Sequence, residues 1–343
     1  MKKVFLSCLG LVCAVGALCN SAMPGLWEAG ANGRFVPLFA GDSMYLGKIR
    51  MQHELVLVNL YPGFAVVKGE YYMYNTSDET INMHVAYPKQ ATYSDTIVQN
   101  VIPAYIDGLQ VLVNEVPVAL MRKNDPEFDS LVNAPNSSVH SEVSNTSENW
   151  FVWKMSFPPK SYTKITVYFL TDNSHAKLRR GYSGDEGQAF SYVLESGRAW
   201  GGDIDSGKIC VALKNGLTTK DVKGVLPFNA LMGDATHLLY QFVNKEPESK
   251  DNMLIWYQGA ATDLAFEKNI VPAAGKYYTE IDSFDIDAFS NHQFTALQLT
   301  DLEVHATSPF AWIFYGILGF AAIIIFMIIY GAYRLIAKRN RAQ

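Results

Sequence analysis

The sequence predicts an all-β ectodomain made of two tandem β-sandwich-like units and followed by a single transmembrane α-helix. Three observations predict this class. Apolar and polar residues alternate with a period of two over most of the chain. No long helical period interrupts this alternation before residue 309. Residues 309–333 then carry no charged side chain, and about 20 apolar residues suffice to cross a bilayer as a helix.

Short strands separated by polar turns account for the ectodomain. Residues 150–157 and 164–170 both alternate, and Pro158-Pro-Lys-Ser161 between them is typical of a turn, so we expect these two segments to form a hairpin. A second hairpin is expected around Asn114-Glu115. The predicted strand segments are residues 52–60, 65–74, 81–87, 109–121, 150–157, 164–170, 189–194, 209–213, 237–243 and 253–257.

Chain length indicates how these strands are divided. A sandwich domain commonly takes about 100 residues or somewhat more, so the ectodomain has room for two. The polar, glycine-containing stretch from Asp172 to Gly187 is the best boundary. We therefore expect a first unit over residues 23–175 and a second over residues 185–305.

The N-terminus has the pattern of a secretory signal peptide. Lys2 and Lys3 precede an apolar stretch, and small residues follow near Ala22, so residues 1–22 are predicted to be removed on export. Lipidation at Cys19 is an alternative, although Leu18 stands where a lipoprotein signal has a small residue. With a stop-transfer helix, this pattern predicts a type I single-pass protein of the cell membrane, whose ectodomain is periplasmic or extracellular.

The predicted span has the flanks of a membrane helix. Its predicted interface residues are aromatic at both ends and basic after the second end, namely Trp312, Tyr315, Tyr330, Tyr333 and Arg334. Residues 334–343 form a short basic tail, which the positive-inside rule places in the cytoplasm. The membrane is therefore one predicted partner.

Charge and cysteine content exclude some function classes. The chain has 28 Lys and Arg against 33 Asp and Glu. Six of the cations lie at the two ends, which leaves 22 against 33 in residues 23–308. Such an acidic surface repels phosphate backbones, so nucleic acid is not an expected partner. Cys210 is the one cysteine beyond residue 22, and its apolar strand predicts burial as a small hydrophobic residue.

Aromatic and glycine spacings in the first two thirds of the chain resemble a known family. The matching motifs are Trp150…Trp153, Tyr162-x-x-Ile165-x-Val167-x-Phe169 and Phe190-x-Tyr192-x-Leu194-x-x-Gly197-x-x-Trp200-x-Gly202. Over residues 45–215 they resemble a family of exported, β-rich bacterial envelope proteins that is a domain of unknown function. The resemblance implies a bacterial cell envelope and carries no catalytic residue with it.

Metal-binding and hydrolytic motifs are weak. The seven histidines are isolated, without HExxH or paired spacing. Asp203 and Asp205, in Gly201-Gly-Asp-Ile-Asp-Ser-Gly207, are the best candidate metal ligands, although the acid that ends a calcium loop is missing. Gly181-Tyr-Ser-Gly-Asp185 lacks the last glycine and the strand-to-helix context of a nucleophile elbow.

Two function classes follow from these observations. We expect a binding or accessory module without catalytic residues or cofactors, whose ligand is an envelope protein partner or a glycan. The alternative is a membrane-tethered hydrolase of cell-surface or cell-wall polysaccharide, because glycosidase carboxylates come from separate strands and leave no local motif. Glu195, Asp203, Asp282, Asp285 and Asp287 are the carboxylates it would recruit.

Overall fold

The structure is a computed structural model of the whole chain. It describes residues 25–27, 35–37, 40–45, 47–88, 99–102, 106–122, 125, 150–180, 183–226, 231–248, 251–257, 264–297, 320, 327 and 330. The predicted signal peptide with Cys19, and the predicted tail over residues 334–343, lie outside these residues and stay predictions.

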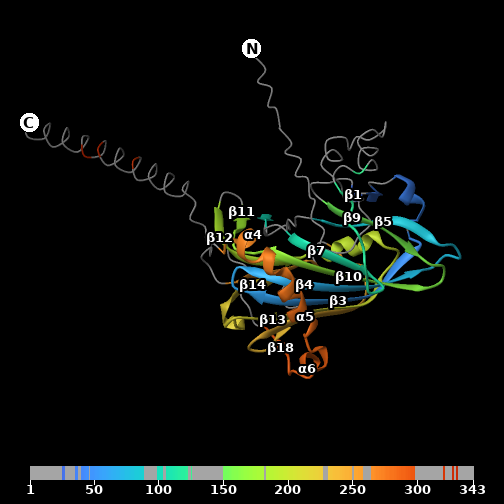
Figure 1. Cartoon of the computed structure of the whole chain (residues 1–343). Coiled ribbons are helices and arrows are strands. Elements are labelled where there is room, and N and C mark those ends of the chain that lie inside the picture. The colour runs from blue at the N-terminus through green and yellow to red at the C-terminus, as the bar shows by residue number, and fades with distance from the viewer. Residues whose placement is uncertain are drawn as a thin grey trace, which may run out of the picture.

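A nine-stranded sheet forms the centre of the molecule (Figure 1). Its strands follow the order β18-β15-β16-β13-β3-β4-β10-β7-β8. The bounds are β3 Ile49–Tyr61, β4 Phe64–Asn75, β7 Ile106–Val113, β8 Val116–Pro117, β10 Tyr162–Asp172, β13 Ile204–Leu213, β15 Met232–Gly233, β16 His237–Lys245 and β18 Thr295–Ala296.

Parallel pairing of β3 with β13 joins the two halves of the chain in this sheet. The register runs from Ser206 beside His53 to Leu213 beside Leu60, and every other neighbouring pair of the sheet is antiparallel. The predicted fold class is therefore wrong in its two tandem sandwich units. Strands from both predicted units complete one sheet, and local alternation carries no information on such distant pairing.

A second β layer packs against one face of the central sheet. It consists of a five-stranded sheet with the order β14-β17-β12-β11-β6 and a two-stranded sheet, β5-β9. The bounds are β5 Ile81–Pro88, β6 Gln99–Ile102, β9 Trp150–Phe157, β11 Ala176–Arg180, β12 Ser183–Tyr192, β14 Val222–Leu226 and β17 Met253–Tyr257. Apart from these layers, β1 Gly25–Trp27 pairs with β2 Phe35–Pro37.

The predicted hairpin of residues 150–157 and 164–170 does not form. Both segments are strands, but β9 pairs with β5 and β10 pairs with β4 and β7. The turn after Phe157 thus carries the chain from one layer to the other. By contrast, the hairpin around Asn114-Glu115 is confirmed, with both residues at positive φ (47° and 66°) between β7 and β8, as a tight hairpin turn requires.

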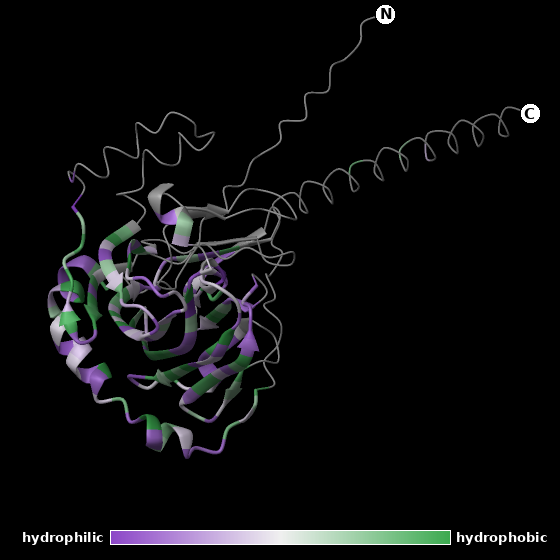
Figure 2. Cartoon of the chain, turned by 90° about the vertical axis from the view of Figure 1, so that its right-hand side faces the viewer, coloured by the Kyte–Doolittle hydropathy of each residue, from purple (hydrophilic) through white to green (hydrophobic). Residues whose placement is uncertain are grey.

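The main core fills the space between the two β layers. Alternate residues of the central sheet, such as Val56, Val58 and Val67, are fully buried against aromatic side chains of the second layer, including Trp153 and Phe190. Figure 2 shows the corresponding alternation of hydrophobic and hydrophilic residues along the strands. The period-two pattern of the sequence therefore correctly predicts which strand residues face this core.

Short helices cover part of the opposite face, called the outer face below. They are α4 Phe266–Asn269, α5 Ala274–Asp282 and α6 Ile286–Ser290, and in Figure 1 α5 crosses in front of the central sheet while α6 lies below it. Within the described residues, 3-10 turns lie at Ala40–Tyr45, Glu195–Ala199, Thr219–Asp221 and Val271–Ala273. The all-β prediction missed α4 to α6 because each is too short to show a helical period.

The helices enclose a second, smaller apolar cluster. Phe266, Tyr278 and Ile281 pack against outer-face residues of the sheet such as Leu57 and Cys210. Cys210 is fully buried in β13, and this burial raises the pKa of its thiol to about 12. The prediction that Cys210 is a buried strand residue is confirmed.

The predicted transmembrane helix needs a correction. Among the residues that the structure describes, no helix combines the length and the apolar character that crossing a bilayer demands. Of residues 309–333, the structure describes Phe320, Met327 and Tyr330, which are helical and exposed. Trp312, Tyr315, Tyr333 and Arg334 lie outside the described residues. An uncharged stretch is necessary for a membrane-spanning helix but not sufficient. The prediction of a single-pass transmembrane helix is therefore wrong for the described residues.

Candidate functional site

A broad hollow lies on the outer face beside the helices. Its volume is about 570 Å³. Polar and apolar side chains from four neighbouring strands and from α6 line it, including His53, Leu55, Tyr72, Ser206, Lys208, Gln241, Val243 and Ile286. The lining is more apolar than polar, with a few polar side chains, and such a hollow on an open sheet face is the kind of surface that binds a ligand from solvent.

A second hollow adjoins the first. Its volume is about 300 Å³, and it lies between β15, β16, α6 and the segment before β18, where Phe289 and Phe294 line it. Lys208 and Gln241 line both hollows. We call the two neighbouring hollows together the outer groove, since they share these two side chains.

The register of the sheet explains how distant residues meet in the outer groove. Ser206 of β13 lies beside His53 of β3 and opposite Val243 of β16. Two residues further along, Lys208 lies beside Leu55 and opposite Gln241. Because alternate residues share one face of a sheet, these two rows point to the same side.

A serine and a histidine of the outer groove form a hydrogen-bonded pair. His53 Nδ1 lies 2.9 Å from Ser206 Oγ, which is the distance of a nucleophile and its base. The ring neighbour of His53 is Tyr72, in an edge-to-face contact at 6.3 Å. Both residues lie within paired strands, where the ladder uses the backbone N–H groups that an oxyanion would need. The pair is therefore suited to binding rather than to acyl transfer.

Charged residues beside the outer groove are already paired with one another. Lys68 contacts Asp282 at 2.9 Å and Glu70 at 3.3 Å, and Lys164 contacts Glu70 at 3.0 Å. Burial opposes the charge on Lys68, but the hydrogen bond to Asp282 and the charge of Glu70 outweigh it, so the pKa of Lys68 lies above its ordinary value. This network fixes α5 to the sheet.

Lys208 has a different environment. No carboxylate among the described residues forms an ion pair with its amine. The side chain is half-buried in the wall that the two hollows share. Its charge is thus available to a ligand.

The sequence-predicted metal ligands Asp203 and Asp205 are engaged by an arginine. Arg50 Nη2 lies 3.0 Å from Asp205 Oδ1 and donates to the backbone carbonyl of Asp203 at 3.4 Å. A guanidinium therefore already supplies the positive charge that a cation would bring. The pair stays a prediction without geometric support.

The other predicted carboxylates do not converge. Asp282 pairs with Lys68, and Asp285 caps α6 by accepting a hydrogen bond from the Ala288 N–H at 2.8 Å. The residues that line the outer groove include one acidic residue, Glu54, whose carboxyl oxygen accepts a hydrogen bond from Tyr192 in the core between the layers. A pair of carboxyl groups flanking a substrate, as glycosidases have, is not formed by these lining residues.

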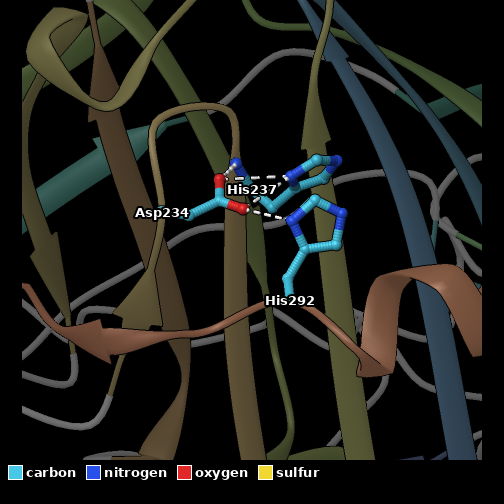
Figure 3. A group of neighbouring side chains, drawn as sticks. All are labelled: Asp234, His237 and His292. Carbon is cyan, nitrogen blue, oxygen red and sulfur yellow. Dashed lines mark hydrogen bonds and ion pairs between the residues drawn. The ribbon is translucent and has the colours of Figure 1, made fainter.

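A cluster that the sequence did not predict lies at the edge of the central sheet. Asp234, in the turn between β15 and β16, faces two histidines, His237 at the start of β16 and His292 after α6 (Figure 3). Asp234 Oδ2 lies 3.1 Å from His237 Nδ1 and 2.7 Å from His292 Nδ1. The two imidazole rings have centroids 4.4 Å apart.

Backbone hydrogen bonds hold the carboxylate of this cluster in place. Asp234 Oδ1 accepts from the N–H groups of Thr236 and His237, both at 2.7 Å. Burial raises the pKa of Asp234, but the hydrogen bonds from Thr236 and His237 outweigh it, so that the pKa lies below its ordinary value. The turn thus presents an ionised carboxylate to the two imidazoles.

Sequence inspection could not find this cluster. Asp234 and His237 are three residues apart, a spacing typical of an Asx turn, and His292 follows 55 positions after His237. Pairing of β15 with β18 brings the segment of His292 to this edge. Only the tertiary fold contains that information.

Comparison with known proteins gives distant likenesses. No protein-family model and no curated protein matches the chain. A "putative nutrient binding protein" of Legionella pneumophila has a TM-score of 0.41 at 13% identity, with 70% of this chain and 74% of that chain covered. An M1 zinc metallopeptidase of Deinococcus radiodurans has a TM-score of 0.30 at 10% identity, and yeast LTA4 hydrolase one of 0.31 at 9%.

The coverage of the two enzymes is partial. In each case 62% of this chain is covered, which spans 43% of the metallopeptidase and 29% of the yeast hydrolase. At these TM-scores the likenesses assign neither an activity nor a ligand to this chain. The resemblance to exported envelope proteins stays a prediction.

Proposed function

We propose that this β-rich protein is an extracytoplasmic binding module and that its ligand occupies the outer groove. The observation that carries the proposal is the convergence of His53, Ser206, Lys208 and Gln241, from three adjacent strands, in a hollow of about 570 Å³. The signal-peptide pattern of residues 1–22 supports a location outside the cytoplasm.

The chemistry of the outer groove favours a glycan as the ligand. Hydroxyl, imidazole, amide and ammonium groups offer several directional hydrogen bonds, and the ring of Tyr72 adds an amphipathic surface. The groove is open, and its lining combines apolar surface with several polar groups, which suits a sugar because a sugar has both apolar ring faces and hydroxyl groups. Lys208 would hold an electronegative group of that ligand, because it forms no ion pair with the described residues.

Binding is favoured over polysaccharide hydrolysis for a specific reason. Hydrolysis of a glycosidic bond needs two carboxyl groups on either side of the scissile bond. Glu54 is the acidic residue of the lining, and its side chain lies on the core side of β3 with Tyr192. The residues of the groove can therefore orient a glycan, while they lack the acid and base that would cleave it.

Binding of soluble oligosaccharides from bacterial cell envelopes to the purified full-length chain tests the proposal. Isothermal titration should detect at least one ligand, and Lys208→Ala should weaken its binding about tenfold or more, because a hydrogen bond to a charged group contributes roughly 1.5–3 kcal/mol. Lys177→Ala is the matched control, since Lys177 is an exposed lysine of β11 in the other layer.

Two results would contradict the proposal. If Lys208→Ala and Gln241→Ala both bind the oligosaccharide as tightly as the unaltered chain, the ligand does not occupy the outer groove. If no oligosaccharide binds but an extended peptide does, the ligand class is wrong, and pairing with an exposed sheet edge such as β8 or β18 becomes the better account.

A further inference from the structure

We propose that Asp234, His237 and His292 form a binding site for one first-row divalent metal ion of the kind that prefers imidazole ligands, with zinc as the reference ion. The site is separate from the proposed glycan function and does not depend on it. Its ligands would be Oδ2 of Asp234 and the Nδ1 atoms of the two histidines, the three atoms that converge in Figure 3.

The distances fit a metal ion after a small expansion. The candidate ligand atoms all lie within 4.8 Å of one another. A zinc ion about 2.0–2.2 Å from each nitrogen and oxygen would place tetrahedral ligand atoms about 3.4 Å apart. The observed 2.7 Å contact of His292 would lengthen by about 0.7 Å and the 3.1 Å contact of His237 by about 0.3 Å. A side-chain rotation of His292, which is 41% exposed, can supply the larger of these two changes.

Hydrogen bonds and ring packing hold these side chains in place, as outer contacts commonly hold metal ligands. The backbone N–H groups of Thr236 and His237 donate to Oδ1 of Asp234 and so hold the carboxylate, and both of its oxygens lie 3.1 Å from His237 Nδ1. Phe289 packs edge-on against the ring of His237, with centroids 5.4 Å apart. These contacts fix two ligands on one turn, while His292 approaches from a different segment.

The donor set identifies the class of ion. Two imidazoles and one carboxylate suit zinc, iron, nickel or copper, whereas calcium and magnesium prefer sites made of oxygen atoms. Metal binding through Nδ1 requires the imidazole tautomer whose proton lies on Nε2. Each neutral histidine can reach it by exchanging one proton with solvent, so the metal replaces two N–H···O bonds without a net change in proton number.

A metal ion here would connect two separate segments. Asp234 and His237 belong to the β15–β16 hairpin, and His292 belongs to the connection between α6 and β18. Phe289 and Phe294 on either side of His292 line the smaller hollow of the outer groove. An ion shared by the two segments would therefore hold this wall of the groove against the sheet, and it would stabilise the folded chain by mass action.

Metal titration of the purified full-length chain, after treatment with a chelator, tests the site. We expect one zinc ion per chain by calorimetry, and substitution by cobalt should give visible absorption bands of a low-coordinate nitrogen and oxygen site. His292→Ala and His237→Ala should each weaken zinc binding roughly 100-fold or more, since even outer partners of metal ligands commonly contribute 10–100-fold. The zinc-dependent rise in melting temperature should disappear with them.

Three control variants sharpen the result. His175→Ala removes an exposed histidine far from the cluster in sequence and should leave zinc binding unchanged. Asp234→Asn keeps the Oδ1 acceptor of the turn but removes the charge, and should weaken binding as well. Lys208→Ala should bind zinc normally, which separates this site from the glycan proposal. Circular dichroism of each variant establishes that it is folded.

The proposal is overturned by either of two outcomes. Zinc binding of unchanged stoichiometry and affinity in both His292→Ala and His237→Ala would place the ion elsewhere. Absence of zinc and cobalt binding to the unaltered chain would show that the three side chains form two ordinary imidazole–carboxylate hydrogen bonds and no metal site.

Discussion

The hydroxyl of Tyr192 donates a hydrogen bond of 2.7 Å to Oε1 of Glu54, in the core between the central sheet and the second layer. Glu54 is 3% exposed and Tyr192 is fully buried. A further hydrogen bond of 2.9 Å joins the hydroxyls of Tyr192 and Tyr71. A buried carboxyl group is expensive without such partners, so this short chain of polar groups holds β12 in one register over β3 and β4.

Replacement of Tyr192 by phenylalanine is expected to destabilise the fold. The ring stays, but Glu54 loses a buried donor, which costs roughly 1–3 kcal/mol of unfolding free energy. Urea denaturation of the full-length chain measures the loss. Tyr162→Phe is the matched control, because Tyr162 is 57% exposed and donates to Gln52 at the surface. Equal effects of the two substitutions would refute a special role for the buried pair.

Stability should fall at alkaline pH. Burial is the first cause that raises the pKa of Tyr192, and of Tyr61 and Tyr257, above the ordinary value of 10.0. The unfolded chain therefore loses these phenolic protons first. Stability from this source is fully present below about pH 10 and is lost as the pH rises further. Urea unfolding across this range, read with tyrosinate absorbance, checks the prediction. Ionisation of all tyrosines before unfolding would contradict it.

The sequence predicted the strands better than their partners. The predicted strands include residues 52–60, 65–74 and 253–257, and all three are strands in the structure. Each has one buried and one more exposed face, or is bounded by clear turns. Pairing is a different matter. Whether residues 150–157 join residues 164–170 or residues 81–88 depends on which layer each segment occupies, and alternation alone does not encode the layer.

Alanine at position 207 is expected to disrupt the pairing of β13 with β16. A Cβ atom there would overlap the ring of Phe242, which lies opposite Gly207 in the register. Overpacking of this kind costs about 1–3 kcal/mol, measurable by thermal or urea unfolding. The double variant with Phe242→Ala should lose less stability than Gly207→Ala because the overlap is removed.

Gly275→Ala is the matched control for that substitution. Gly275 lies in α5, and apart from its chain neighbours and the backbone of its own helix, no atom lies within 4 Å of the position that an alanine methyl group would take there. Alanine should leave stability unchanged or raise it slightly, because it is a better helix former than glycine. A loss as large as that of Gly207→Ala would show that the cost at position 207 is not steric.

Cys210 is expected to be inert in the folded protein. Its burial and its raised thiol pKa keep the thiolate population negligible at neutral pH. In a chain with Cys8, Cys13 and Cys19 changed to serine, an aromatic disulfide reagent should react with Cys210 only after addition of denaturant. A dimer that reductant dissociates would contradict the burial of this thiol.

The candidate sites show where sequence information ends. Asp203 and Asp205 lie close together in the chain, and their spacing predicted a pair of metal ligands. Arg50, more than 150 positions earlier, instead donates to the Asp205 carboxylate and to the Asp203 carbonyl. Asp234, His237 and His292 meet because β18 pairs with β15. The position of the outer groove likewise depends on where the short helices pack on the outer face. Contacts of this kind arise from topology and leave no local pattern.

The parallel pairing of β3 with β13 also sets an order of events during synthesis. His53 and Ser206, which meet across these strands, are separated by 153 positions. Until Leu213 has emerged, the hairpin of β3 and β4 has an unpaired inner edge and cannot reach its final partner. Such distant pairings make folding slow and leave strand edges open to aggregation meanwhile. A nascent chain of this protein therefore exposes this edge of β3 for as long as the residues up to Leu213 are being synthesised.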